Sequence, residues 1–220
     1  MIVAVSLWEY VGDEWDRLLE LAIEHLRIVL MSIAIAVVIG VGLGLSTYRT
    51  NRPRHIVLAV TSAFLTIPSF ALFGLLISPL GLGTKPAVVA LVMYALLPIV
   101  RNTITGLREV DPAIVESAQG MGMGRLRRLL RVELPLAWPV IIAGIRVSTQ
   151  ILVGIAAIAA VINGPGLGKD IFRALARVGT PTALNQALAA VLAIIVLGLV
   201  LDVGLMLLGR LTTSRGTRGR

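Results

Sequence analysis

The side chains that carry most protein chemistry are scarce in this chain of 220 residues. It has no cysteine, which excludes disulfides, thiol catalysis and cysteine-ligated metal sites. Its two histidines, His25 and His55, lie far apart in the sequence, so we expect no metal site. The polar groups that remain are hydroxyl and amide side chains inside apolar runs, and one strongly charged segment between two such runs.

Two groups of small polar side chains stand inside the apolar runs. Ser62, Thr66 and Ser69 are spaced so that they share one face of a helix, with Pro68 beside them. The second group consists of Ser148, Thr149 and Gln150. Such groups either line a path for a polar solute or hydrogen-bond neighbouring helices to one another, as small polar residues commonly do in membranes. The sequence leaves both interpretations open.

The charged segment covers residues 106–135 and reads GLREVDPAIVESAQGMGMGRLRRLLRVELP. Asp111 and Pro112 are typical of a helix start, since aspartate caps the first turn and proline fits its first position. We expect a short helix to about Gln119, and then a turn at three glycines, because glycine tolerates tight turns. These are Gly120, Gly122 and Gly124. A basic helix is expected over about 125–133.

Five apolar runs must position these groups. Each is near the roughly twenty residues that a helix needs to cross a hydrocarbon core of ~30 Å. The runs cover about 28–46, 56–78, 86–106, 135–162 and 185–208. The whole chain is 57% hydrophobic, above the about 45–50% of soluble domains. The sequence therefore predicts an all-α integral membrane protein with about five transmembrane helices, the second interrupted by a proline.

Composition divides the chain into three parts. Residues 1–27 carry six acidic side chains in an amphipathic pattern, unlike the basic start and short apolar run of a secretory signal. We expect this part to remain on the mature protein as a short helix near the membrane surface. Residues 28–209 form the predicted transmembrane domain, and residues 210–220 form a basic tail.

The 20 basic residues lie unevenly around the apolar runs. Thirteen lie in three regions on one side of the membrane: the connection after the first run, the stretch from the end of the third run to the fourth, and the tail. Six lie in the segments on the other side. Because cytoplasmic loops carry the excess of Lys and Arg, the amino terminus is predicted outside and the carboxyl terminus in the cytoplasm. The topology thereby accounts for the net charge of +8, and binding to nucleic acid is not needed to explain it. Four arginines place segment 106–135 in water or against another protein, since each would cost about 2.5–3.5 kcal/mol inside a span.

Part of this segment resembles the signature of binding-protein-dependent importers of the ATP-binding cassette class. That signature is E-A-A, three residues, G, nine residues and I-x-L-P on a cytoplasmic loop. This chain has, at the same spacing, Glu116, Ser117, Ala118, Gly122, Val132, Leu134 and Pro135. Ser117 for alanine and Val132 for isoleucine are conservative departures. An ordinary basic loop is the other interpretation, and the full spacing argues against it.

The resemblance implies a permease subunit with the type I importer fold, like that of the methionine importers (MetI-like), with coupling helices on the cytoplasmic side. In that family the short helices dock in a groove on the ATP-binding subunit and move with it as two such subunits close around ATP. Glu116 would offer a charge to that partner, Ala118 would permit close packing, and Gly122 would permit the turn.

The resemblance also implies where the chemistry and the partners lie. ATP and Mg²⁺ would be bound by separate ATPase subunits, because this chain has no Walker-type phosphate loop. We therefore expect no cofactor and no enzymatic activity on this chain. The other implied partners are a second permease subunit, identical or related, an extracytoplasmic substrate-binding protein, and the lipid of a bacterial cytoplasmic membrane.

The resemblance covers about residues 20–210 and is nearest to the osmoprotectant branch, which imports glycine betaine, carnitine, choline and related quaternary amines. The stretches that carry it are TIPSFALFGLLISPLGLG (66–83), ALLPIVRNTITGLREVDPAIVESAQGMGM (95–123) and GPGLG (164–168). The methionine importers are the competing branch. Aromatic cages usually bind quaternary ammonium groups, and the chain has ten aromatic residues without a visible cluster. Specificity is therefore expected to reside in the binding protein.

Two features outside the charged segment carry further expectations. A charge inside a span is expensive and usually faces protein or water, so Arg146 is expected to pair with Asp202 or to reach the cytoplasmic surface, as Arg101 does. Residues 163–175 combine a glycine-rich turn with an amphipathic helix on the outer side. They close the outer end of a path, receive the binding protein, or simply connect two spans.

Two other classes of membrane protein fit the sequence less well than an importer does. A membrane-embedded enzyme needs acids, histidines or cysteines placed for chemistry inside the membrane, and the spans contain almost none. A secondary transporter usually has paired repeats or charged sites for a coupling ion, which five spans and one signature loop do not suggest.

Overall fold

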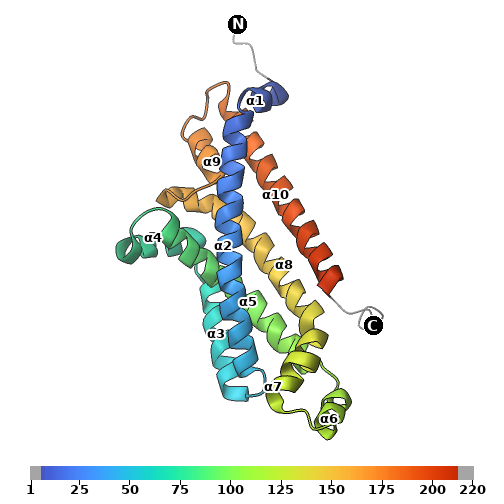
Figure 1. Ribbon diagram of the computed structural model, residues 1–220. Coiled ribbons are helices and arrows are strands. Elements are labelled where there is room, and N and C mark those ends of the chain that lie inside the picture. The colour runs from blue at the N-terminus through green and yellow to red at the C-terminus, as the bar shows by residue number, and fades with distance from the viewer. Residues whose placement is uncertain (1–5, 213–220) are drawn as a thin grey trace.

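The regular structure is entirely helical over residues 6–212, which this computed structural model describes (Figure 1). The helices are α1 (Leu7–Asp13), α2 (Trp15–Thr47), α3 (Asn51–Thr66), α4 (Ser69–Leu80), α5 (Thr84–Arg108), α6 (Pro112–Gly120), α7 (Arg125–Arg128), α8 (Leu134–Ile158), α9 (Gly168–Leu175) and α10 (Ala183–Thr212). A π-helical turn (Leu129–Glu133) joins α7 to α8, and a 3-10 turn (Ala159–Ile162) follows α8. The predicted all-α fold class is confirmed.

The spans agree with the predicted apolar runs, with one difference. α2, α5, the continuous helix Arg125–Ile162 and α10 are each long and apolar enough to cross a membrane. α3 and α4 supply a fifth span only as a pair, because they are bent by 100° where they meet. The run at 56–78 therefore forms two helices, where the sequence predicted one span with a proline in its middle.

The break between α3 and α4 lies at Ile67 and Pro68. Proline has no N–H to donate and favours an extended residue before it, and Ile67 has a ψ of 128°. The freed carbonyl of Ile67 accepts a hydrogen bond of 2.6 Å from the hydroxyl of Tyr94 on α5. A neighbouring helix thus satisfies the broken backbone, as a hydrocarbon surrounding requires.

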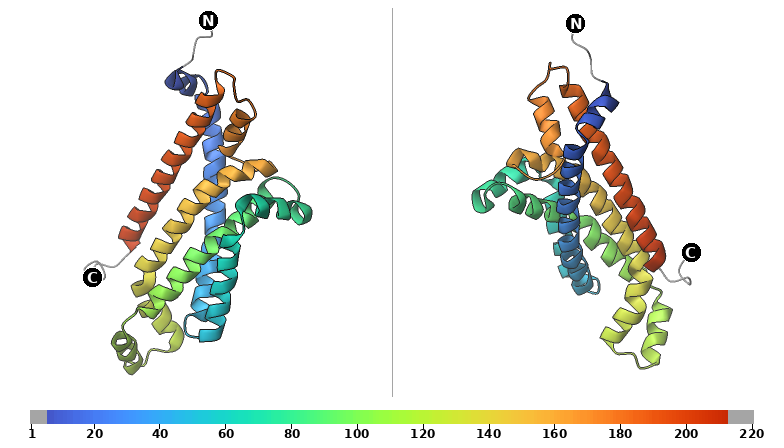
Figure 2. Two further views of the ribbon diagram at one scale, coloured as in Figure 1. Left: turned by 180° about the vertical axis from the view of Figure 1, so that it is seen from behind. Right: turned by 45° about the horizontal axis from the view of Figure 1, so that its top comes forward.

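α5 is the centre of the bundle and lies between α2 and α8 (Figures 1 and 2). It is the most buried of the spans, because 67% of its apolar stretch lies inside the protein. The helices come closest where a side chain is missing: a Cβ on Gly144 of α8 would lie 2.7 Å from the carbonyl oxygen of Pro98 on α5. α10 differs, because only 6% of its apolar stretch is buried. It packs at the edge of the bundle and turns apolar side chains outward.

Residues 1–27 are predicted to carry a short surface helix, and the described residues 6–27 form α1 and the first turns of α2. α1 is short and has a capping box between Ser6 and Glu9. α2 then begins at Trp15 and continues without a break through the first predicted span. Its early turns are amphipathic, with Leu18 and Leu21 buried among residues of α1, α10 and the segment before α9. In the basic tail, residues 213–220 lie outside the described residues.

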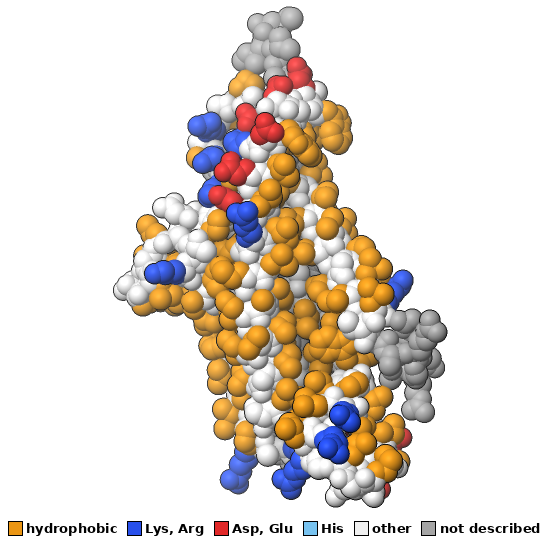
Figure 3. Space-filling model, in the orientation of Figure 1, with side chains coloured by type: hydrophobic (Ala, Val, Ile, Leu, Met, Phe, Trp, Pro, Cys, Tyr) orange, Lys and Arg blue, Asp and Glu red, His pale blue; other side chains and the backbone are white. Residues whose placement is uncertain are grey.

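Charged side chains mark the two ends of the molecule. Figure 3 shows hydrophobic side chains over the middle of one face, acidic side chains gathered at the upper end, and basic side chains at both ends. Below, the end that carries α6 is called the α6 end, and the opposite one, with α1 and α9, is called the α9 end (Figure 1). The apolar middle between them is the surface expected of a protein in lipid.

Candidate functional site

The first helix of the 106–135 segment starts where the sequence predicts. Asp111 caps α6, its Oδ1 atom accepting a hydrogen bond of 2.8 Å from the amide of Ala113. Pro112 fills the first turn, where the missing N–H costs nothing. Glu116 and Ser117 are exposed on this helix, and the Ser117 hydroxyl donates to the Ala113 carbonyl at 2.7 Å.

The turn after α6 depends on Gly122, whose φ of 77° lies in the left-handed region that other residues adopt at a cost. Its amide donates to the Gln119 carbonyl at 2.9 Å, and the amide of Met123 donates to the Ala118 carbonyl at 3.2 Å. A Cβ at Gly122 would meet nothing within 4 Å. The conformation, and not a lack of space, requires glycine here. We call residues 106–135 the hairpin.

The signature residues of the hairpin differ in exposure. Glu116, Ser117, Gly122 and Pro135 are exposed, Val132 and Leu134 are half-buried, and Ala118 is buried. Ala118 has only 2% of its surface exposed within this single chain, so its small size is explained by packing of the hairpin itself. Glu116 and Ser117 are the exposed signature residues on α6 itself.

A buried carboxylate fastens the hairpin to the end of α2. Glu133 is 3% exposed. Its Oε1 atom accepts from Arg128 at 3.0 Å and from Arg49 at 2.7 Å, and its Oε2 atom accepts from the Tyr48 hydroxyl at 2.8 Å. Arg128 also donates to the side chain of Gln119 on α6 at 3.1 Å. This cluster is called the Glu133 network.

Tyr48 is held in its protonated form inside the network. Burial raises the pKa of Tyr48 to about 12, and the hydrogen bond to the Glu133 carboxylate adds to the rise. The guanidinium of Arg49 lies 5.0 Å from the centre of the tyrosine ring, within cation–π range. The phenol therefore donates to Glu133 at every physiological pH.

The first group of polar residues within the spans is split by the break at Pro68. Ser62 and Thr66 belong to α3, whereas Ser69 begins α4 at an angle of 100° to it. The three side chains therefore do not share one helix face, which corrects the expectation from their spacing. The Thr66 hydroxyl donates to the Ala63 carbonyl of its own helix at 2.8 Å.

The second group points to different neighbours. The Ser148 hydroxyl donates to the Ala95 carbonyl of α5 at 2.8 Å, and the Gln150 amide donates to the Gly198 carbonyl of α10 at 3.0 Å. Thr149 is buried and bonds to the backbone of its own helix at Ile145. The contacts of Ser148 and Gln150 join α8 to its neighbours, as the second of the two interpretations expects, whereas that of Thr149 stays within α8.

Arg146 forms an ion pair with Asp202, as one of the two predicted alternatives states. Two parallel hydrogen bonds of 2.9 and 2.7 Å join the guanidinium on α8 to the carboxylate on α10. Arg101, on α5, is exposed. Within residues 6–212, no three His, Asp or Glu side chains are grouped so that they could hold a metal ion.

The comparisons with known proteins identify the family. The family model described as "Binding-protein-dependent transport system inner membrane component" matches residues 36–213. The chain belongs to this family. The resemblance of the hairpin to an importer permease is thereby confirmed, and below the chain is called the permease.

Its relatives include several osmoprotectant permeases. The permease is 40% identical over 215 residues to the osmoprotectant import permease protein OsmW of Salmonella typhimurium, covering 95% of this chain and 98% of that one. It is 36% identical over 196 residues to the glycine betaine/carnitine/choline transport system permease protein OpuCB of Bacillus subtilis, covering 89% and 88% of the two chains. The choline transport system permease protein OpuBB of Bacillus subtilis is 39% identical over 164 residues, which covers 74% of this chain and 76% of that one.

A solved structure shares the fold. A chain of the MetNI methionine ABC transporter in an inward-facing conformation matches with a TM-score of 0.79 over 90% of the permease and 96% of that chain. The sequence identity is 21%, so this likeness concerns the fold. The expected methionine-importer type of fold is confirmed.

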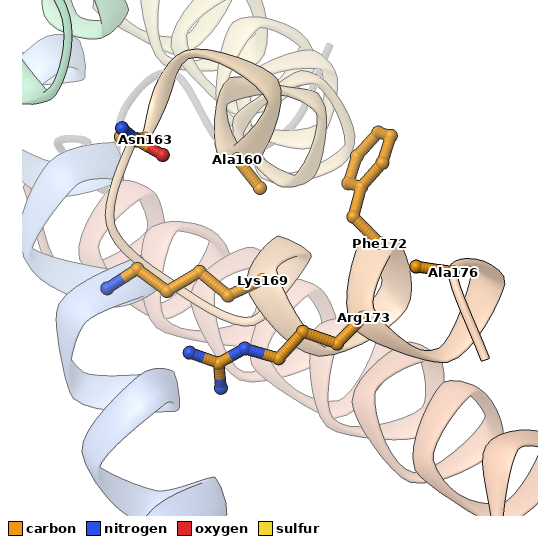
Figure 4. Close-up of a pocket in the computed structure, with 6 residues that line it drawn as sticks. All are labelled: Ala160, Asn163, Lys169, Phe172, Arg173 and Ala176. Carbon is orange, nitrogen blue, oxygen red and sulfur yellow. The ribbon is translucent and has the colours of Figure 1, made fainter.

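At the α9 end, the glycine-rich segment and α9 are fixed to α2. The Glu24 carboxylate of α2 accepts from the Gly166 amide at 3.0 Å and from the Lys169 ammonium at 2.8 Å. Figure 4 shows an open pocket beside this contact, with Lys169 and Arg173 extending in the same direction from α9. Its lining residues are Ala160, Asn163, Lys169, Phe172, Arg173 and Ala176.

The Glu133 network of the permease is not predictable from the order of residues along the chain. Arg128 was grouped with three neighbouring arginines as a residue in water, but it is 8% exposed and paired with Glu133. One signal in the sequence points to this pair: segment 125–133 contains four arginines and a single acid, Glu133. Its partners Tyr48 and Arg49 lie more than eighty residues away in sequence, so spacing alone does not reveal them.

Proposed function

We propose that the permease is the membrane-spanning subunit of an ATP-driven importer, and that the hairpin is the part that docks on the ATPase subunit. One observation carries this proposal. α6 stands at one end of the molecule with Glu116 and Ser117 exposed, while its other face is fixed by Ala118, the Gly122 turn and the Glu133 network. A helix that is packed on one face and exposed on the other can transmit a displacement from a bound partner to the transmembrane helices.

The proposed orientation places the α6 end in the cytoplasm. Basic residues concentrate in the hairpin, in the α2–α3 connection and in the tail, which favours the cytoplasmic side for all three. The amino terminus then lies outside a bacterial cytoplasmic membrane and the carboxyl terminus inside. Two permease subunits, identical or related, would enclose one path, and ATP with Mg²⁺ would bind to the ATPase subunits.

The proposed solute is a quaternary-amine osmoprotectant, such as glycine betaine, choline or carnitine. Relatives that match most of this chain are named for such solutes. Ten aromatic residues without an obvious cage favour weak binding along the path. Selection would then belong to an extracytoplasmic binding protein that delivers the solute to the α9 end.

The segment 163–175 is the proposed contact for that binding protein. Its glycine-rich turn and α9 are held firmly by Glu24, while Phe172 and Arg173 remain exposed beside the pocket. Crosslinking from Lys169 to a bound binding protein would test this contact, and a docked complex without any crosslink would contradict it.

The function is tested by reconstitution in liposomes. The permease, a cassette ATPase and a binding protein encoded nearby would be combined, and uptake of radiolabelled glycine betaine, choline, carnitine and methionine measured. We expect uptake of at least one quaternary amine that requires hydrolysable ATP. Uptake by the permease alone would contradict the importer, and uptake of methionine alone would contradict the solute class.

Glu116 offers a matched pair of variants for the same assay. Glu116→Lys reverses the exposed charge on α6 and is expected to abolish uptake while the protein still inserts. Asp16→Lys reverses an exposed charge near the start of α2, at the opposite end of the molecule, and is expected to retain most of the uptake. Equal activity of the two variants would remove α6 as the docking helix.

A further inference from the structure

The Glu133 network connects two parts of the permease that no helix joins directly. Gln119 lies on α6, Arg128 on α7, and Glu133 in the π-helical turn before α8. Tyr48 and Arg49 lie where α2 ends and turns toward α3. An unbroken series of hydrogen bonds therefore runs from the proposed docking helix to the α6 end of α2.

The network has the features of a rigid connection. Glu133 and Arg128 are both largely buried, so their ion pair is shielded from water and salt. Glu133 uses both carboxylate oxygens and receives donors from two separate segments. π-helical turns often occur at functional sites, and this one places the carboxylate between the hairpin and α2.

We propose that Glu133 is a positioning residue that passes movement of α6 to the α6 end of α2 and to the α2–α3 connection. This inference rests on the proposed docking function of the hairpin. α6 packs on α7 and on the π-helical turn, so a displacement of α6 reaches α2 through Arg128 and Glu133. Without the carboxylate, the hairpin keeps its two helices but loses its fixed orientation relative to α2.

A distance measurement tests the connection without any partner. The chain has no cysteine, so Met121→Cys on the hairpin and Arg52→Cys at the start of α3 supply two unique sites for spin labels. Both positions are exposed and lie outside the network. In lipid nanodiscs we expect one narrow distance distribution for the otherwise unchanged chain. Adding Glu133→Gln is expected to broaden it at least two-fold, and adding Glu109→Gln to leave it unchanged.

Two milder variants cover the case in which Glu133→Gln fails to fold. Gln119→Ala removes the link to α6, and Tyr48→Phe removes one donor at α2 while keeping the ring. Each is expected to broaden the distribution by less than Glu133→Gln. Unchanged distributions in both would overturn the inference, whatever happens to Glu133→Gln.

A coupling measurement separates a positioning role from a merely structural one. In liposomes with the ATPase and the binding protein, Glu133→Gln is expected to assemble and hydrolyse ATP, while solute moved per ATP falls at least ten-fold. A purely structural residue would lower the amount of complex and leave that ratio unchanged, which would overturn the inference. If Glu116→Lys leaves transport intact while Glu133→Gln still broadens the distances, the docking function fails and the physical connection stands.

Discussion

The permease has a buried carboxylate near each of its two ends, Asp170 and Glu133. Each one accepts hydrogen bonds from side chains near one end of α2. At the α9 end, Asp170 is fully buried and pairs with Arg17 near the start of α2 and with Gln186 of α10. At the α6 end, Glu133 is buried and accepts from Tyr48 and Arg49 at the end of the same helix.

The surroundings of the two carboxylates differ. Asp170 lies among helices that also pack through apolar side chains, since Leu18 and Leu21 of α2 contact Leu167 and Ala189. Around Glu133 the connection to α6 passes through polar side chains, Arg128 and Gln119. The same chemistry therefore strengthens a packed end in one place and orients an exposed hairpin in the other. We expect loss of Asp170 to affect stability first, and loss of Glu133 to affect transport first.

The largest effect on stability is expected at the α9 end. Asp170→Ala removes the buried carboxylate that accepts from both Arg17 and Gln186, while Arg17 keeps its contact with Glu14. Each lost hydrogen bond to the charged group costs about 1.5–3 kcal/mol. The thermal midpoint of the purified protein in detergent should fall sharply, while Asp16→Ala, which removes an exposed acid, should leave it unchanged. A similar midpoint for the two variants would remove the distinction between the ends.

A third ion pair, between Arg146 and Asp202, lies within the spans and between the two ends of the molecule. Asp202→Leu leaves Arg146 without its carboxylate, and a lone arginine in a span costs about 2.5–3.5 kcal/mol. The double variant Arg146→Met with Asp202→Leu removes both charges and should recover most of the loss. Membrane-inserted, folded protein after expression measures both, and a double variant worse than the single one would contradict a structural pair.

The turn of the hairpin is expected to respond to alanine with opposite signs at two neighbouring glycines. Gly122→Ala forces a side chain into the left-handed region at a cost of roughly 1–2 kcal/mol. Gly120→Ala adds a Cβ to a helical residue with open space around it and should stabilise α6 by about 0.5–1 kcal/mol. Hydrogen exchange of the α6 amides reports both changes, and equal exchange would show that the turn does not depend on Gly122.

The smallest effect is expected from one hydroxyl of the Glu133 network. Tyr48→Phe removes a single hydrogen bond and keeps the ring under Arg49, and Glu133 retains its two arginine donors. The free energy of unfolding should therefore fall by only about 0.5–1.5 kcal/mol. Solute moved per ATP should fall more clearly than stability does. A loss of stability with an unchanged transport ratio would place Tyr48 with Asp170 as a packing element.

The sequence predicted the elements that local rules govern. Asp111 and Pro112 define the start of α6, and Gly122 defines the turn after it, because capping and left-handed backbone are properties of neighbouring residues. The apolar runs predict the spans apart from the bend at Pro68, and the cost of a lone charge in lipid makes the pair of Arg146 with Asp202 one of the two predicted arrangements.

The remainder depends on how distant segments meet. The proline at 68 was visible, but a bend of 100° depends on Tyr94 of α5 satisfying the freed carbonyl. The separation of Ser69 from Ser62 and Thr66 follows from that bend. Glu133 and Tyr48 are 85 residues apart in sequence, and no periodicity links them. Burial of Arg128 could not be read from a segment that looks uniformly basic.

Contact between the exposed face of α6 and an ATPase subunit is the most direct test. A benzophenone attached at Ser117→Cys in the cysteine-free chain should capture the ATPase subunit in the assembled transporter after illumination. The same probe at Leu175→Cys, exposed at the α9 end, should not capture it. Capture at Ser117 alone is the predicted result, and an active transporter in which Ser117 captures no ATPase would contradict the coupling role of the hairpin.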